Sequence, residues 1–191
     1  MSKIKDSIIL LLEGLSEEYG LDIKDVNFKD TPDRVERAYA EIFSGIKDTR
    51  IQIRDILLSR FPSNGVSEMI ISKGNLVYSV CPHHLLPVRY VIDIAYIPGD
   101  EWVLGISKLA RIAEVLAKRP VLQETMTEDI GKVLDEGLET LGVGVKVEGK
   151  HFCVKMRGAK QHNSSVITSY TSGAFRDSYN TRMEFLKLIE R

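Results

Sequence analysis

The stretch LVYSVCPHHLLPVRYVIDIAYIPGD, residues 76–100, decides the fold. Residues 76–80 form a strand-like run, and residues 90–97 alternate and are rich in β-branched side chains. Pro98-Gly99-Asp100 then turns the chain. The stretch therefore predicts two hairpin-like strands that flank a loop beginning at Cys81. Loops at strand ends commonly carry function.

Helices and further strands are predicted on both sides of this stretch. Helical spacing of apolar residues and strand-like alternation follow one another along the chain. Their order predicts an α+β protein with antiparallel strands and helices laid on one face. We expect an N-terminal helical region over residues 1–50 and a second domain over residues 51–191. The expected helices cover residues 3–19, 31–45, 105–118, 127–142 and 181–189, and the expected strands cover residues 68–72, 76–80, 90–97, 142–156 and 164–172, with a short helix and a loop between residues 51 and 64.

Composition excludes several classes of protein. The 191 residues include 26 Lys plus Arg and 27 Asp plus Glu, so the formal charge is -1 and no general affinity for nucleic acid is indicated. The longest apolar run, Ile8 to Leu12, is too short for a signal peptide or a membrane span. We therefore expect a cytoplasmic globular protein without a membrane partner.

Metal-binding side chains are concentrated in two short segments. Residues 81–84 (CPHH) and 151–153 (HFC) contain both cysteines and three of the four histidines of the chain. Cys81 and His84, spaced Cys-x-x-His, form a chelating pair on a turn, and Cys153 is a third candidate ligand. Three protein ligands leave a fourth tetrahedral position for water, which is the pattern of a catalytic zinc site.

Two other interpretations of these segments stay open. Cys81 and Cys153 could form a disulfide, although a chain with two cysteines and no export signal is expected to keep its thiols reduced. His162 could close the metal site as a fourth ligand, but it lies in the polar stretch of residues 160–165, which is typical of a solvated loop. We favour the three-ligand site.

His83 and His151 remain beside the predicted metal. Residues two apart on a strand share a face, so we expect His151 and Cys153 to point the same way. A histidine, with an ordinary pKa of about 6.5, is suited to moving protons beside a catalytic zinc. The alternative is that His83 is merely the neighbour of a ligand and His151 an ordinary strand residue.

Cationic side chains mark two expected helices. Lys108 and Arg111 fall in the first turns of the helix over residues 105–118, for which Ser107 is the expected N-cap. Free N–H groups and positive side chains converge there, which favours an anion such as phosphate. Arg34 and Arg37 are adjacent on the helix that follows Thr31, the expected N-cap, but their spacing alone assigns them no role.

Seven motifs, in order along the chain, resemble those of the GTP cyclohydrolase I family. The resemblance runs from about Thr31 to Ile189. It implies a zinc enzyme of pterin and folate synthesis that opens the guanine imidazole ring of GTP, giving 7,8-dihydroneopterin triphosphate and formate. It also implies the T-fold for residues 51–191 and a ring-forming homodecamer of two pentamers with active sites at subunit interfaces. The motifs are Thr31-Pro32-x-Arg34, Cys81-x-His83-His84, Gly105-x-Ser107-Lys108-Leu109-x-Arg111, Gln123-Glu124, His151-x-Cys153, Arg157-Gly158 and Asn180-Thr181-Arg182-x-Glu184-Phe185-Leu186.

The resemblance also implies a role for each matching residue. Zinc would be bound by Cys81, His84 and Cys153, and protons would be moved by His83 and His151. The guanine edge would be held by Glu124, helped by Gln123; both are expected in the connection between two helices. The remaining matches would hold the triphosphate or ribose: Ser107, Lys108, Arg111, Arg157 and, from a neighbouring subunit, Arg34 and Arg37.

The chain departs from the family pattern in two places. The usual Cys-Glu-His-His reads Cys-Pro-His-His, with Pro82, and the usual Gly-Lys after the histidines is replaced within residues 85–91. Both changes lie near the expected pocket. They motivate the alternatives of another purine nucleotide as substrate or a formylated product. A nitrile reductase of the same fold and a binding protein with a structural zinc were also weighed. Zinc-ligand spacing disfavours the reductase, and the retained His83, His151 and Glu124 disfavour the binding protein.

Overall fold

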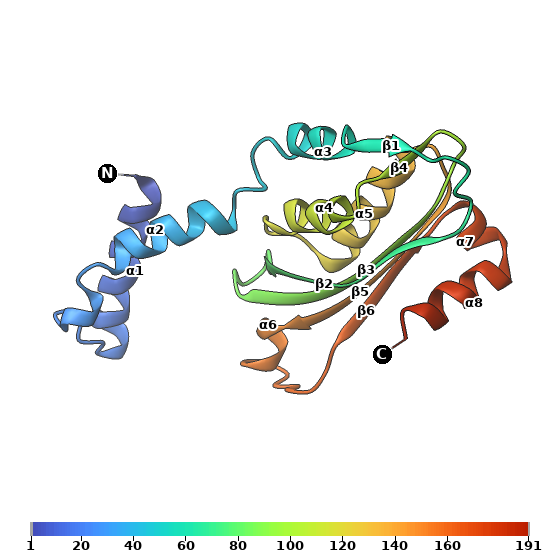
Figure 1. The fold of residues 1–191 in the computed structure, drawn as a ribbon. Helices are drawn as coiled ribbons and strands as arrows, with labels where there is room; N and C mark the ends of the chain where they lie inside the picture. The colour runs from blue at the N-terminus through green and yellow to red at the C-terminus, as the bar shows by residue number, and fades with distance from the viewer. Residues whose placement is uncertain (1, 191) are drawn as a thin grey trace. The chain divides into compact units, whose positions relative to one another are not determined.

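The computed structural model describes residues 2–190 (Figure 1). The chain divides into two compact units, Met1–Ser44 and Gly45–Arg191. Among residues 2–190, no helix is both long and apolar enough to span a bilayer.

The N-terminal unit consists of α1 (Lys3–Tyr19), a short 3-10 helix (Val26–Phe28) and α2 (Thr31–Ile42). Its first helix was predicted correctly: the Ser2 hydroxyl accepts from the Lys5 N–H at one end, and Gly20 takes φ 73° at the other. A Lys5–Asp33 ion pair of 2.6 Å joins α1 to α2. The prediction of Thr31 as N-cap was wrong. Asp30 holds that position without a side-chain cap bond, because the helix already includes Thr31.

The second unit is built on a four-stranded antiparallel sheet in the order β2-β3-β5-β6. The α+β prediction is therefore confirmed. Two short strands, β1 and β4, pair separately. The elements in chain order are α3 (Thr49–Leu57), β1 (Arg60–Pro62), β2 (Ile70–Val80), β3 (Pro87–Pro98), β4 (Trp102–Leu104), α4 (Ser107–Ala117), α5 (Gln123–Gly137), β5 (Thr140–His151), α6 (Phe152–Lys155), β6 (Val166–Thr171), α7 (Gly173–Asp177) and α8 (Tyr179–Leu188).

Alternation along the central strands builds two apolar layers. Tyr90, Ile92 and Ile94 of β3 belong to the large core between the sheet and helices α4 and α5. Ala95 faces the opposite way and belongs to a smaller cluster with α7 and α8, whose members include Phe175 and Phe185. Figure 1 shows α4 and α5 on one face of the sheet and α7 and α8 on the other. The two central helices thus cover one face as predicted, and the C-terminal helices add a partial second layer.

One long strand replaces the two strands predicted over residues 68–80. The β2 pairing with β3 shifts between Ser72 and Asn75 without ending. Gly74, with φ 76°, occupies this irregularity, and the Asn75 amide donates to the carbonyl oxygens of Ser72 and Ile92. A β-bulge therefore interrupts the alternation in the sequence while the strand continues.

Other predicted boundaries were also wrong: α2 ends at Ile42 and not at Gly45, and α5 ends at Gly137 and not at Gly142. Helix α5 begins at Gln123 and not at Thr127, because the Thr127 hydroxyl donates to the Gln123 carbonyl oxygen within the helix. Ser107 is the first residue of α4 and not its N-cap, a position that Ile106 holds without a side-chain bond. Strand β5 ends at His151 and does not continue to Met156, because α6 begins at Phe152 with His151 as its N-cap.

Gly131 is predicted to be essential for packing α5 on the sheet. A Cβ atom at this position would lie 2.2 Å from the Tyr170 ring, whose hydroxyl donates to Asp135 at 2.5 Å. Because this bond holds the ring in place, Gly131→Ala should lower the free energy of unfolding by about 2 kcal/mol or more. Urea denaturation measures the loss. Gly14→Ala, with nothing within 4 Å of the new methyl group, is the matched control and should not destabilise the protein.

Candidate active site

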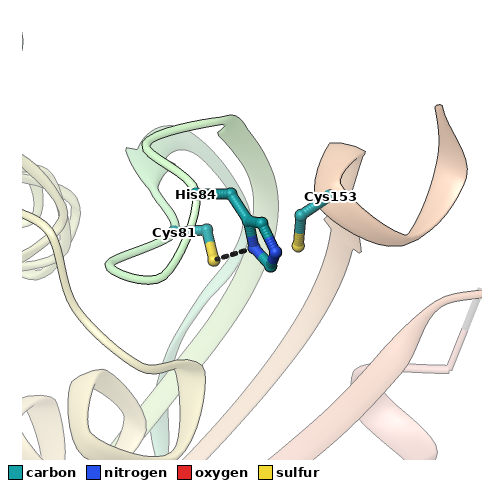
Figure 2. Close-up of side chains that lie close together, drawn as sticks. All are labelled: Cys81, His84 and Cys153. Atoms are coloured by element: carbon teal, nitrogen blue, oxygen red, sulfur yellow. Dashed lines mark hydrogen bonds between the residues drawn. The ribbon is translucent and has the colours of Figure 1, made fainter. Parts of the chain in front are cut away.

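Three side chains from two distant segments meet at one end of the sheet. Cys81 follows β2, His84 lies in the loop before β3, and Cys153 lies on α6 directly after β5. Their candidate ligand atoms all lie within 4.8 Å of one another (Figure 2). The pairing of Val88 with His151 brings the two segments together, because it places the end of β5 beside the start of β3.

One ligand distance in this cluster matches that of a tetrahedral metal site. The Cys81 Sγ lies 3.8 Å from the His84 Nδ1, and ligand atoms around a tetrahedral zinc ion are about 3.5 to 3.8 Å apart. The local backbone supports this arrangement, since the Cys81 N–H donates to the Leu86 carbonyl oxygen and the Leu85 N–H donates back to Cys81. Two sulfur atoms and one imidazole nitrogen form a donor set that suits zinc.

The alternative interpretations of the cysteines and of His162 find no support in the geometry. Both cysteines are free, Cys81 buried and Cys153 partly buried. The cluster found among residues 2–190 contains Cys81, His84 and Cys153 without His162. The backbone carbonyl oxygen of His162 accepts instead from the Lys155 amine.

His151 is held at the edge of this cluster, although not as predicted. Because β5 ends at His151, this residue and Cys153 do not share a strand face. The His151 Nε2 lies 2.8 Å from the Gln123 Oε1, and its ring packs edge-on against Tyr90 with centroids 5.9 Å apart. Burial lowers the pKa of His151, an effect that the charge of Glu124 partly opposes. The ring is therefore neutral at neutral pH and able to accept a proton.

The other predicted site residues lie at several places around this end. His83 is exposed, with its Nδ1 3.9 Å from the Cys81 Sγ. The Arg157 Nη1, just after α6, lies 2.8 Å from the His84 Nε2. Glu124 is exposed in the first turn of α5, where the positive end of the helix dipole favours a carboxylate.

The predicted phosphate ligands lie on two different helices. Ser107, Lys108 and Arg111 occupy the first turns of α4. Arg34 and Arg37 lie on α2 in the N-terminal unit, where Arg34 forms an exposed ion pair with Asp30 at 3.3 Å. The predicted roles of all five residues stay predictions.

Tyr90 is a site residue that sequence reasoning missed. It is fully buried, and its hydroxyl has no hydrogen-bond partner among residues 2–190. Burial raises the pKa of Tyr90, and the nearby charges of Glu124, Cys81 and Cys153 raise it further. A tyrosine within an alternating strand predicts only a core residue. The one available signal was its position inside the segment that departs from the family pattern.

Comparisons with known proteins agree with this geometry. The family model of GTP cyclohydrolase I matches residues 10–190. A GTP cyclohydrolase 1 of Caldanaerobacter subterraneus subsp. tengcongensis is 40% identical over 98% of this chain and 95% of its own length. One from Dehalococcoides mccartyi is 42% identical over 98% of this chain and 96% of its own length.

A solved structure offers a more distant match. An archaeosine synthase QueF-like protein aligns with 60% of this chain and 94% of its own, with 19% sequence identity and a TM-score of 0.43, which is too low to support an argument. The family model and the relatives that span nearly the whole chain decide the matter. The chain belongs to the GTP cyclohydrolase I family.

Proposed function

We propose that this protein hydrolyses GTP to 7,8-dihydroneopterin triphosphate and formate in the cytoplasm, with zinc as its cofactor. The observation that best supports this proposal is the cluster of Cys81, His84 and Cys153 beside His151, in a chain of the GTP cyclohydrolase I family. The two free cysteines are consistent with a reducing compartment. The second unit of the chain is the proposed catalytic domain.

Cys81, His84 and Cys153 would hold the zinc ion. Zinc bound there supplies Lewis acidity that activates water at neutral pH. Arg157 lies beside the same His84 ring, so this arginine lies between the metal end of the site and the proposed triphosphate end.

Helix α5 would orient the purine. The helix begins without a side-chain cap, which leaves its first N–H groups for a ligand. The Glu124 carboxylate in this first turn can accept hydrogen bonds from the N1–H and 2-amino groups of guanine, while backbone N–H groups can donate to O6. Guanine presents this set of donors and acceptors along one edge, whereas adenine lacks it.

The cationic residues would hold the triphosphate. Lys108 and Arg111 on α4, together with Arg157, offer charge-assisted donors to phosphate oxygens, and Ser107 offers a hydroxyl. Arg34 and Arg37 would contribute from a neighbouring subunit. Binding the charged end of the substrate firmly places the purine C8 for attack.

His151 and His83 would move protons during the reaction. Addition of water at C8 opens the imidazole ring, a second water releases formate, and the rearranged ribose recloses with loss of one water. Each step transfers protons at purine nitrogens or sugar oxygens. Neutral His151 can accept a proton at its unbonded ring nitrogen, and a protonated imidazole can return it.

A homodecamer of two pentamers is the proposed assembly. In the described sheet, β2 and β6 are the outer strands, and each carries exposed apolar side chains: Leu76 and Tyr78 on β2, and Val166 and Ile167 on β6. Strand edges of this kind pair readily with another chain. Their pairing between copies would extend the sheet around a ring.

The first test is to incubate the zinc-loaded protein with GTP, identify the products by mass and assay formate in parallel. Dihydroneopterin triphosphate with an equal amount of formate is the expected result. A formylated product, or turnover of another purine nucleotide in place of GTP, would favour the alternative that Pro82 and the altered segment of residues 85–91 motivate. Intact GTP with zinc-loaded protein would count against the proposal.

Glu124→Gln should impair guanine recognition. The change replaces a charged acceptor by an amide that can accept only through one oxygen, so binding of GTP should weaken by about 10- to 100-fold. Kd for GTP, measured by calorimetry, is the readout. Glu128→Gln is the matched control, because Glu128 lies one turn further along α5 and forms an exposed ion pair with Lys132. Equal GTP affinity in the Glu124→Gln variant and wild type would contradict the assignment.

A further inference from the structure

Gln123 lies within a buried hydrogen-bond network that fixes its orientation. The side chain is 2% exposed. Its Nε2 donates to the carbonyl oxygens of Val147 at 3.1 Å and Val166 at 2.9 Å, and to the Thr168 hydroxyl at 3.1 Å. Two carbonyl oxygens can only accept, so the amide nitrogen must face them and the amide oxygen must face the other way.

A second set of bonds closes the network and agrees with this direction. The Thr127 hydroxyl lies 2.7 Å from the Gln123 carbonyl oxygen, which can only accept, so Thr127 donates there. The Thr127 and Thr168 hydroxyl oxygens are 2.6 Å apart. Since the Thr127 hydrogen is already used, Thr168 donates to Thr127 and accepts from Gln123. The bonds therefore run in one direction, from the Gln123 amide through Thr168 and Thr127 to the Gln123 backbone carbonyl oxygen, and a flip of the side-chain amide would break its bonds to Val147 and Val166.

The orientation of Gln123 determines which nitrogen of His151 carries the proton. The Gln123 Oε1 can only accept, and it lies 2.8 Å from the His151 Nε2. His151 must therefore donate from Nε2–H, which leaves Nδ1 as the only ring nitrogen that can accept a proton while the ring is neutral.

Gly149 and Tyr90 hold the ring in this position. A Cβ atom on Gly149 would lie 2.1 Å from the Gln123 Oε1 and 2.9 Å from the Tyr90 ring, so only glycine admits both side chains. The edge-on Tyr90 ring then limits rotation of the His151 ring. Gln123 thus contacts the His151 ring at Nε2, and Tyr90 packs edge-on against the same ring.

We propose that Gln123 is a positioning residue that holds His151 in the Nε2–H tautomer, and not the guanine contact that the family resemblance implies. Its polar side-chain atoms are all engaged inside the protein, which leaves the purine to Glu124 and the backbone. The catalytic part of this inference rests on the proposed function of His151.

The direct test measures the tautomer. Wild-type, zinc-loaded protein with 15N-labelled histidines is examined by solid-state NMR at pH 8, above the ordinary imidazole pKa of about 6.5. The chain has four histidines, so a His151→Gln sample identifies the His151 signals. We expect a protonated Nε2 and an unprotonated Nδ1. The opposite tautomer would overturn the inference, whatever the activity toward GTP.

Gln123→Met then separates positioning from substrate binding. Methionine keeps the length of the side chain and removes its hydrogen bonds, so the His151 tautomers should mix and kcat should fall by about 10- to 100-fold. KM for GTP should change by less than about 3-fold, because the substrate contacts remain. Tyr170→Phe is the matched control: it removes another hydrogen bond between α5 and β6, to Asp135, without touching His151.

The outcomes distinguish the two hypotheses. A large rise in KM with an unchanged tautomer in Gln123→Met would restore Gln123 as a substrate contact and overturn the inference. An equal loss of kcat in Tyr170→Phe would mean that the loss in Gln123→Met comes from general destabilisation of the protein. This result would also overturn the inference. Absence of GTP turnover in wild type would refute the proposed function, while the NMR result would still decide the role of Gln123.

Discussion

Replacing Cys153 with serine is expected to remove the bound metal and to lower turnover of GTP by at least ~10³-fold. A serine hydroxyl is a poor zinc ligand compared with a thiolate, and only Cys81 and His84 would remain of the three-residue cluster. Two ligands cannot hold the ion in a fixed position. Metal content by mass spectrometry and kcat measured on the same sample should fall together.

A serine introduced at a nearby exposed position provides the control for this change. Met156 is 61% exposed just after α6, so Met156→Ser introduces the same side chain without removing a candidate ligand. This variant should keep its metal and its activity. Full metal content in Cys153→Ser would exclude Cys153 as a ligand, and full activity in a metal-depleted sample would exclude the metal from the reaction.

Replacing His151 with glutamine should have the second largest effect. The glutamine amide can still donate to the Gln123 Oε1, as His151 Nε2 does, but it cannot accept and return a proton. Turnover should therefore fall by about 10²- to 10⁴-fold, the usual contribution of a general acid–base group. Metal content should stay unchanged, because His151 lies outside the three-residue cluster.

His162→Gln is the comparison for this variant. His162 is exposed in the loop before β6, outside the cluster of candidate ligands. Its replacement should leave turnover and metal content as in wild type. If the His151→Gln variant turned over GTP at the wild-type rate, the assignment of proton transfer to His151 would be wrong. If it lost metal, His151 would instead be a ligand or the support of one.

The elements and the metal cluster were predictable because their signals are local or rare. The apolar spacing of residues 3–19 suffices for α1, and Gly20 marks its end. Alternation predicts the long strand β3, which runs from Pro87 to Pro98 and so begins three residues earlier and ends one residue later than the expected range of 90–97. Cysteine and histidine are scarce in this chain, so their concentration in two segments was informative without any knowledge of the fold.

The errors arose where partners distant in sequence decide the structure. The alternating residues after His151 resemble a strand, but the β5 ladder with β3 ends at Val88. Pro87, the next residue along β3, has no N–H with which to continue it. The burial of Gln123 was equally hidden, because its partners Val147, Val166 and Thr168 come from β5 and β6. A glutamine at a helix start otherwise predicts an exposed residue.

The exposed helices of the N-terminal unit are expected to make stability depend on protein concentration in the proposed assembly. None of its described side chains is buried, and Ile4, Leu10 and Leu11 of α1 are 44%, 67% and 56% exposed. Two helices of 17 and 12 residues without a core of their own are marginal in water. Any surface that covers them, including that of another copy, stabilises them by mass action. In the proposed homodecamer, dilution that separates the subunits is therefore expected to destabilise these helices, while the sheet domain retains its core.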